Sequence, residues 1–136
     1  MTRDGLERMR LLMQAAAYGE SKMKRLRDDA ERTTHLLDTL PHRTDHNSSF
    51  EERLIEMLSV QTELTDIYKE LGMLRSEFDQ TVAELDWTQK LLMILRYLDG
   101  LSWNRIAELM KTSPSHVFNL HRRALGHFPK NDGKNH

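Results

Sequence analysis

The sequence predicts an all-α fold. A long antiparallel helical hairpin, similar to a coiled coil, is expected to precede a C-terminal helix-turn-helix module of three helices. Two stretches of about 35 residues carry apolar side chains at helical spacing. Three helix-start signals follow within the last fifty residues. Only six glycines and three prolines occur in 136 residues, too few for the turns of a many-stranded sheet.

The first long helix is predicted from Leu6 to Leu40. With Met9 at heptad position a, eight of the ten a and d positions are apolar when alanine is counted, which is the spacing of a narrow helical seam. The ten positions are Met9, Leu12, Ala16, Gly19, Met23, Leu26, Ala30, Thr33, Leu37 and Leu40. Pro41 ends this helix because its ring restricts the preceding residue and cannot continue the hydrogen-bond ladder.

A polar loop is predicted after Pro41, from the stretch "PHRTDHNSS". Ser49 and Glu52 have the spacing of a capping box, so the second long helix is expected to begin at Ser49. Ser48 and Glu51 offer the same box one residue earlier.

The second long helix is predicted from Phe50 to Leu85. Its seam positions are Phe50, Met57, Val60, Leu64, Ile67, Leu71, Leu74, Phe78, Thr81 and Leu85. Neither helix can bury its stripe alone, so an antiparallel hairpin is expected. Pairing between two chains is the competing solution, and a homodimer through a leftover face of the arm stays open.

Three shorter helices are predicted in residues 86–128, after an arm that spans 1–85. Their expected caps are Asp86, Ser102 and Ser113 at the helix starts and Gly100 and Gly126 at the ends. Pro114 occupies the favoured first helical position of the last helix. Residues 129–136 lack apolar side chains and are predicted to be disordered.

The corner "KTSPS" between the last two helices predicts a helix-turn-helix. The expected inward residues are Ile106, Ala107, Val117, Leu120 and Ala124, with Leu92, Leu95 and Leu98 as a third wall. Lys111 occupies the turn site where the motif usually carries a left-handed glycine. A left-handed lysine costs about 1 kcal/mol, which leaves a turn of different shape open.

The stretch "LRYLDGLSWNRIAELMKTSPSHVFNLHRRAL" resembles region 4 of bacterial sigma-70-type factors, over residues of about 86–128. The shared pattern is an apolar helix, a Gly-Leu-Ser turn, an Ile-Ala helix and a serine-started helix that ends near Ala-Leu. The whole chain is similar to small phage-encoded regulators of Gram-positive bacteria, among them the ArpU-type late-transcription activators and related prophage proteins. The resemblance implies binding to double-stranded DNA and possible contact with RNA polymerase.

The resemblance also implies which side chains meet DNA. The expected base-reading residues are Ser113, Pro114, Ser115, His116, Phe118, Asn119 and Arg122. The expected phosphate contacts are Trp103, Arg105, Lys111, Arg123 and Lys130. For Phe118 and Trp103 a place in the module core is the alternative. His116 and His121 are expected on the surface near phosphate.

Charge agrees with a polyanion partner for the last part of the chain. Residues 1–85 hold 12 lysines and arginines against 17 acidic residues, whereas residues 86–136 hold 8 against 4. No cysteine is present, which excludes disulfides and thiolate metal sites. No apolar run reaches the roughly 18 residues of a membrane span, so a cytoplasmic setting is expected.

No catalytic, metal or cofactor site is predicted, because no phosphate loop, zinc-binding spacing or nucleophile constellation occurs. A DNA-binding transcription regulator is therefore the leading interpretation, with the helical arm for self-association or polymerase contact. The alternatives are a phage DNA-packaging component like a small terminase subunit and a helical interaction protein that does not bind DNA.

Overall fold

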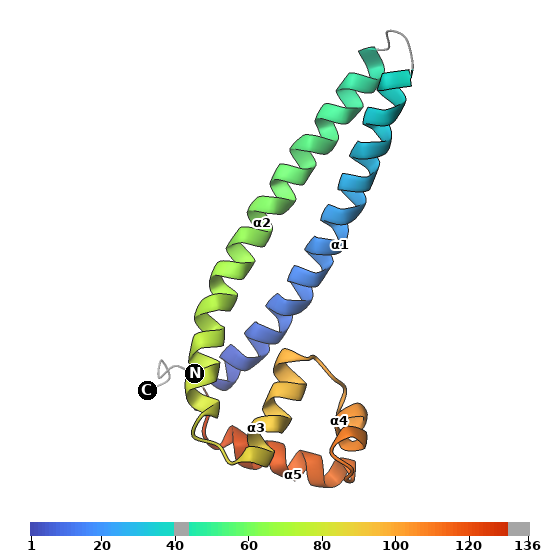
Figure 1. Ribbon diagram of the computed structural model, residues 1–136. Helices are drawn as coiled ribbons and strands as arrows, with labels where there is room; N and C mark the ends of the chain where they lie inside the picture. Colours follow the sequence, from blue (N-terminus) through green and yellow to red (C-terminus); the bar gives the residue numbers. More distant parts are fainter. Residues whose placement is uncertain (40–43, 131–136) are drawn as a thin grey trace. The chain divides into compact units, whose positions relative to one another are not determined.

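A computed structural model describes residues 1–39 and 44–130 of the chain, and the side chains of residues 1–36 and 49–130. Within these residues the structure is helical with no strand, so the all-α prediction is confirmed (Figure 1). The helices are α1 (Arg3–Thr39), α2 (Thr44–Val82), α3 (Trp87–Met93), the π-helix η1 (Ile94–Leu98), α4 (Trp103–Leu109) and α5 (Pro114–Leu125). None of the described helices combines the length and the apolar character that crossing a membrane requires.

The chain packs as two compact units. One, here called the terminal unit, combines Met1–Met13 with the chain from Glu70 onward, and the other, the hairpin unit, is Gln14–Lys69. By packing, the chain therefore divides within the two long helices. The predicted domain boundaries stay a prediction.

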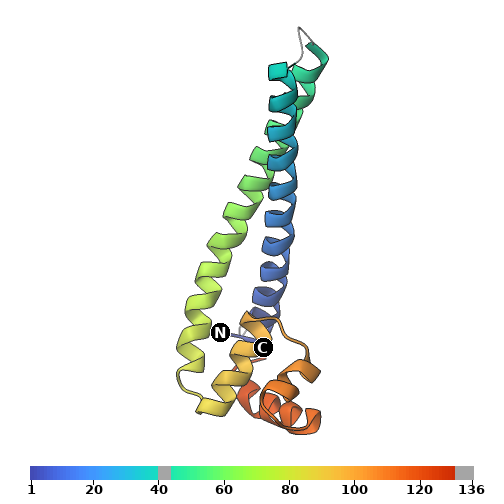
Figure 2. The same ribbon diagram turned by 45° about the vertical axis from the view of Figure 1, so that its right-hand side comes forward.

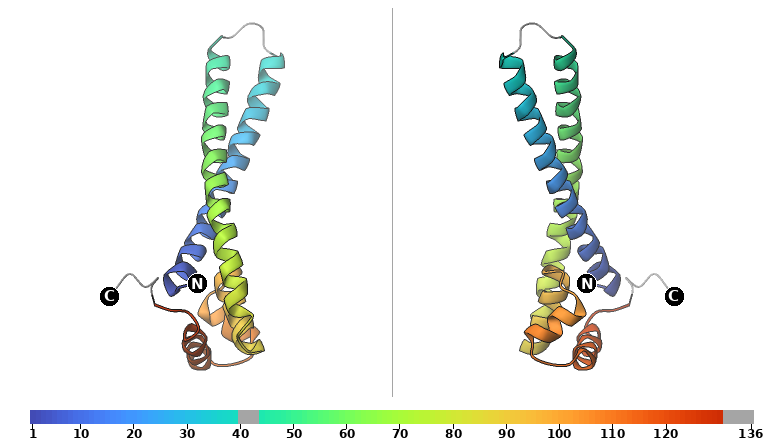
Figure 3. Two further views of the ribbon diagram at one scale, coloured as in Figure 1. Left: turned by 90° about the vertical axis from the view of Figure 1, so that its left-hand side faces the viewer. Right: turned by 90° about the vertical axis from the view of Figure 1, so that its right-hand side faces the viewer.

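The hairpin unit joins α1 and α2 in antiparallel directions (Figure 3). Arg53 Nη1 donates to Thr33 Oγ1 at 2.7 Å, and Lys22 Nζ lies 3.5 Å from Glu56 Oε1. The buried residues of this unit all lie at predicted seam positions, namely Ala16, Met23, Ala30, Thr33, Val60 and Leu64. The hairpin prediction is confirmed, whereas coiled-coil packing stays a prediction.

Helix α2 begins earlier than predicted. It starts at Thr44, so Ser49 and Ser48 lie inside the helix and the predicted capping box is wrong. Ordinary polar residues cost at most about 0.7 kcal/mol each in a helix, so a polar stretch does not stop one. Helix α1 ends at Thr39, just before the predicted stop at Pro41. Pro41 itself lies outside the described residues.

The terminal unit contains a first hydrophobic cluster that draws on five helices and the segment after α5. The start of α1 and the end of α2 pack here with the end of α3, with η1 and with the end of α5. Its fully or nearly fully buried residues include Leu6, Met9, Phe78, Ala124 and Phe128. The hydrophobic stripes of both long helices thus contribute to the core beneath the short helices.

Arg3 ties the start of the chain to the end of α5. Its Nε and Nη2 donate to the carbonyl of Leu125 at 3.2 and 3.0 Å, and Nε also donates to the carbonyl of Phe128 at 3.0 Å. The Arg3 backbone N–H donates to the carbonyl of Pro129 at 2.8 Å. The carbonyl of Leu125 also accepts from the N–H of Phe128 at 2.9 Å, so Arg3 adds donors to that carbonyl and supplies donors to the carbonyls of Phe128 and Pro129. Of the tail that was predicted to be disordered, Pro129 and Lys130 lie within the described residues, and 131–136 lie outside them.

A second hydrophobic cluster holds the three short helices together. Figure 2 shows the course of the chain through these helices. Leu92 of α3, Ile106 and Ala107 of α4, and Val117 and Leu120 of α5 form it, with Leu95 packed against them. These residues confirm the predicted inward faces. The prediction for Leu98 is wrong in detail, because Leu98 packs against the first cluster.

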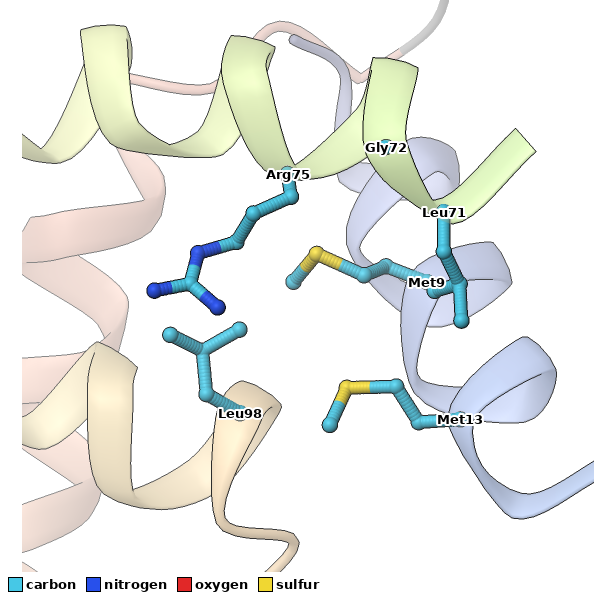
Figure 4. Close-up of a pocket in the computed structure, with 6 residues that line it drawn as sticks. All are labelled: Met9, Met13, Leu71, Gly72, Arg75 and Leu98. Atoms are coloured by element: carbon cyan, nitrogen blue, oxygen red, sulfur yellow. The ribbon is translucent and has the colours of Figure 1, made fainter. Parts of the chain in front are cut away.

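The first cluster leaves a pocket of about 220 Å³ beside Gly72. Figure 4 shows its lining, with the thioethers of Met9 and Met13 facing Leu98 and the Arg75 guanidinium at one side. Arg75 is held there by an ion pair in which Nε lies 3.1 Å from Asp79 Oδ1.

Candidate nucleic-acid interface

Side-chain caps begin all three short helices of the module. Asp86 Oδ1 accepts from the N–H of Gln89 at 2.9 Å. Ser102 Oγ accepts from the N–H of Arg105 at 3.2 Å. Ser113 Oγ accepts from the N–H three residues on at 3.2 Å, with proline as the first helical residue. The predicted N-caps are confirmed, so the start of each helix is determined locally.

The apolar helix predicted before Gly100 changes from an α-helix to a π-helix part-way along its length. It runs as an α-helix to Met93 and then as the π-helix η1, in which the N–H of Asp99 bonds the carbonyl of Ile94 at 3.0 Å. Gly100 takes a φ of 68°, a left-handed conformation that glycine adopts without a steric penalty. The chain therefore turns at the predicted residue, although the wider helix is a feature that the sequence pattern does not indicate.

The turn between α4 and α5 keeps the geometry that a left-handed residue permits. Lys111 has a φ of 54°. Its N–H bonds the carbonyl of Glu108 at 3.2 Å, and the N–H of Thr112 bonds the carbonyl of Ala107 at 3.0 Å. This pair of bonds is a Schellman motif. The turn thus tolerates the steric cost of lysine instead of taking a different shape.

Helix α5 is amphipathic, with one face buried and the other in solvent. Val117, Leu120 and Ala124 are buried, at the spacing of one helix face. The predicted base-reading side chains are all exposed, namely Ser113, Pro114, Ser115, His116, Phe118, Asn119 and Arg122. The first turn of α5 is therefore free to enter a groove, which is the geometry that a helix-turn-helix uses.

Two of these exposed residues orient each other. Arg122 Nη2 donates to Asn119 Oδ1 at 2.8 Å. A side-chain amide can bond adenine and a guanidinium can bond guanine, each through two atoms. The bond brings two groups with distinct base preferences together on one face of α5.

The expected phosphate contacts lie at several points around the module. Lys111, Arg123 and Lys130 are exposed. Arg105 is exposed too, but its Nη1 lies 3.0 Å from Glu108 Oε2 within α4. Arg105 would have to exchange this partner for a phosphate, so its gain from DNA contact is expected to be smaller.

Trp103 is half-buried and packs against the second cluster. Its ring centroid lies 4.6 Å from that of His121, 5.2 Å from that of Phe118, and 4.3 Å from the Arg96 guanidinium carbon. Trp103 therefore lies in the core of the module, which was the alternative to a phosphate contact. Phe118 belongs to the same aromatic group, yet 47% of its surface is exposed.

His121 is not the surface residue that was expected. It is half-buried, and its Nε2 lies 2.8 Å from the hydroxyl of Tyr97. Burial, followed by the positive charges of Arg96 and Arg3, lowers the pKa of His121 to about 4. Burial, followed by nearby Glu7, raises the pKa of Tyr97 to about 12. Both groups are neutral at pH 7 and join η1 to α5.

The sequence did not predict that Arg96, Tyr97 and His121 connect the helices of the module. Arg96 stacks on the ring of Trp103, and its Nη1 donates to the carbonyl of Leu101 at 3.0 Å. One signal was available: His121 lies four residues after Val117 and one after Leu120, on the buried face of α5. The roles of Arg96 and Tyr97 had no comparable signal, because they arise from contacts between helices.

Residues 75–128 match the family model described as "Sigma-70, region 4". No curated protein and no solved structure matches the chain. The match confirms the resemblance predicted for residues of about 86–128 and extends it toward the N-terminus.

The region 4 match begins inside α2. Its first residues include Phe78 and Val82, which are buried in the first cluster with the end of α5. The end of the second long helix is thus part of the region 4 segment by packing as well as by sequence. This segment indicates a DNA-binding helix-turn-helix of the transcription-regulator kind, for which contact with RNA polymerase is possible.

Proposed function

We propose that the protein is a transcription regulator of a phage or prophage, which acts in the cytoplasm of the bacterial host. It inserts the first turn of α5 in the major groove of promoter or operator DNA. The observation that carries this proposal is the exposure of every expected base-reading side chain on a capped helix within the region 4 match. The proposal assigns the chain no catalytic activity, because contact alone performs the task.

The base readers and the phosphate contacts have different parts in the proposal. Asn119 and Arg122 discriminate bases, whereas Lys111 and Arg123 attract any duplex. Serine and proline read bases poorly, so one module is expected to have modest specificity. A helical arm that contacts RNA polymerase or a second copy supplies the remaining selectivity.

The first experiment recovers preferred DNA from a random pool with the full chain at about 50 mM salt, where phosphate attraction is strong. Affinity is then measured by fluorescence anisotropy at rising salt. We expect Arg122→Ala to weaken the preferred site by about 1–3 kcal/mol and to relax its sequence. Arg123→Ala is the matched control on the neighbouring residue. It is expected to weaken all duplexes alike and to lower the salt slope by about one.

The bond between Asn119 and Arg122 allows a sharper test. Because each residue orients the other, the losses of Asn119→Ala and Arg122→Ala are expected to be non-additive by at least about 0.5 kcal/mol in a double-mutant cycle. Absence of any duplex affinity at low salt would overturn the proposed function. So would an Arg122→Ala variant that keeps both the affinity and the preferred sequence.

A separate experiment tests whether the protein acts at phage or prophage promoters. Bound DNA is recovered from a host that carries the gene, and the sites are mapped relative to promoters. Sites concentrated at phage or prophage promoters support the proposal, whereas sites spread without relation to promoters contradict it.

A further inference from the structure

The hairpin unit carries an apolar surface that its own helices do not cover. On α2, Leu54, Ile55 and Leu58 are 40, 66 and 68% exposed. Single exposed aliphatic side chains are ordinary on a protein surface, but three within five positions form a continuous patch. We call these three residues the α2 patch.

The α2 patch borders a groove of about 380 Å³ between α1 and α2. The groove is lined by Met23 and Arg27 of α1 and by Leu54, Met57, Leu58 and Gln61 of α2. Four of these six side chains are apolar, and two are methionines, which adapt their shape to an incoming side chain. A groove of this kind beside an apolar helix flank suits the apolar face of a third helix.

The occupant can be inferred from charge. On the α1 side, Arg27 lines the groove. On α2, Glu51 lies four positions before Ile55 and seven before Leu58, so it shares a helix face with the α2 patch. Within the described part of the chain, Lys22 and Glu56 pair with each other, but Arg27 and Glu51 take part in no ion pair. A partner for this surface therefore needs an apolar stripe that is accompanied by carboxylates.

Helix α2 itself meets this description. Its apolar patch follows Glu51 by one turn. A surface that carries Arg27 on one helix and Glu51 on the other is complementary to a copy of itself turned by 180°, as in an isologous dimer. Four helices can then bury the flanks that a two-helix hairpin leaves exposed.

We propose that the α2 patch and its groove form the contact surface of a homodimer. The α2 helix of each copy lies in the groove of the other, and Glu51 of one copy approaches Arg27 of its partner. The dimer carries two helix-turn-helix modules, one from each copy. This inference rests on the proposed function, in which the helical arm contacts RNA polymerase or a second copy, and it assigns that contact to a second copy and to a defined surface.

The experiment measures the mass of the full chain by sedimentation velocity from about 1 to 100 μM, a range that covers modest interfaces. We expect the wild-type chain to dimerise and Leu58→Glu to stay monomeric. Met73→Glu is the matched control, because Met73 lies on α2, is 71% exposed and belongs to the terminal unit. It should dimerise like the wild type. Circular dichroism checks that both variants keep their helix content.

A charge exchange tests the orientation of the two copies. Arg27→Glu is expected to weaken the dimer by about tenfold, and Glu51→Arg in the same chain is expected to restore it. A wild-type chain that stays monomeric at about 100 μM would overturn the dimer. So would a folded Leu58→Glu chain that dimerises as well as the wild type, or an Arg27→Glu chain that Glu51→Arg does not rescue.

DNA affinity measured on the same samples separates the two proposals. A monomeric chain that still binds duplex DNA through α5 overturns the dimer alone. A chain that dimerises through the α2 patch but has no affinity for DNA overturns the proposed function alone.

Discussion

The terminal unit and the hairpin unit use different parts of the same two long helices, and they pack them differently. In the terminal unit, α1 and α2 supply Leu6, Met9 and Phe78, none more than 1% exposed. In the hairpin unit, Ala16, Ala30 and Thr33 are among the buried positions, and the α2 patch stays in solvent. Two helices can share only a narrow seam, whereas additional helices can surround a large side chain. The unit that must present α5 in a fixed geometry is the one with the fuller core.

The largest effect is expected when an aromatic ring is removed from the core of the terminal unit. Phe78→Ala should destabilise the terminal unit by about 3–5 kcal/mol, because a buried phenyl ring leaves a cavity. Hydrogen exchange should accelerate in α3, α4 and α5, and DNA affinity should fall. The comparison variant, Leu64→Ala, should accelerate exchange in residues 14–69 and leave DNA affinity nearly unchanged. If Phe78→Ala leaves hydrogen exchange in α5 and DNA affinity unchanged, the two long helices do not stabilise the DNA-binding module.

A change of pH tests the neutral pair that joins η1 to α5. The pKa of His121 is lowered from 6.5 to about 4 in the folded chain, so the unfolded chain binds the additional proton first. Stability is therefore full above pH 6.5 and declines as the pH falls toward 4. The shift corresponds to about 3 kcal/mol, which partial exposure of the ring to water reduces to about 1–2 kcal/mol.

Urea unfolding at pH 7 and pH 5 measures this decline. In His121→Gln, which cannot titrate, the decline should be smaller than in the wild type by most of that amount. His116→Gln is the matched control, since His116 is exposed at the start of α5. Its measurement separates the loss of a histidine from α5 in general from the loss of the contact between His121 and Tyr97. If the free energy of unfolding falls equally in the wild type and in His121→Gln, groups other than His121 cause the pH dependence.

The smallest expected effect compares one glycine from each unit. A Cβ added at Gly72 meets no atom within 4 Å, so Gly72→Ala should stabilise α2 by about 0.5–1 kcal/mol through helix propensity. A Cβ added at Gly19 would lie 2.8 Å from Leu64 Cδ2, so Gly19→Ala must displace a buried side chain and should lower stability. Thermal unfolding of both variants checks the signs. A stabilising Gly19→Ala would mean that the hairpin seam is looser than its contacts indicate.

The sequence by itself determined the features that depend on neighbours within about four residues. Asp86, Ser102 and Ser113 cap helices because each side chain reaches an N–H three residues on. Helical periodicity also predicted the seam and the buried face of α5. The start of α2 was missed because a capping pattern does not prevent a helix from extending through ordinary polar residues.

Only the tertiary structure decided which distant residues support the candidate interface. Arg3 bonds the carbonyls of Leu125 and Phe128 from the opposite end of the chain. The neutral state of His121 depends on burial between helices and on charges from other elements. No local pattern encodes these contacts, because their free energy arises only when segments far apart in the sequence exclude water together.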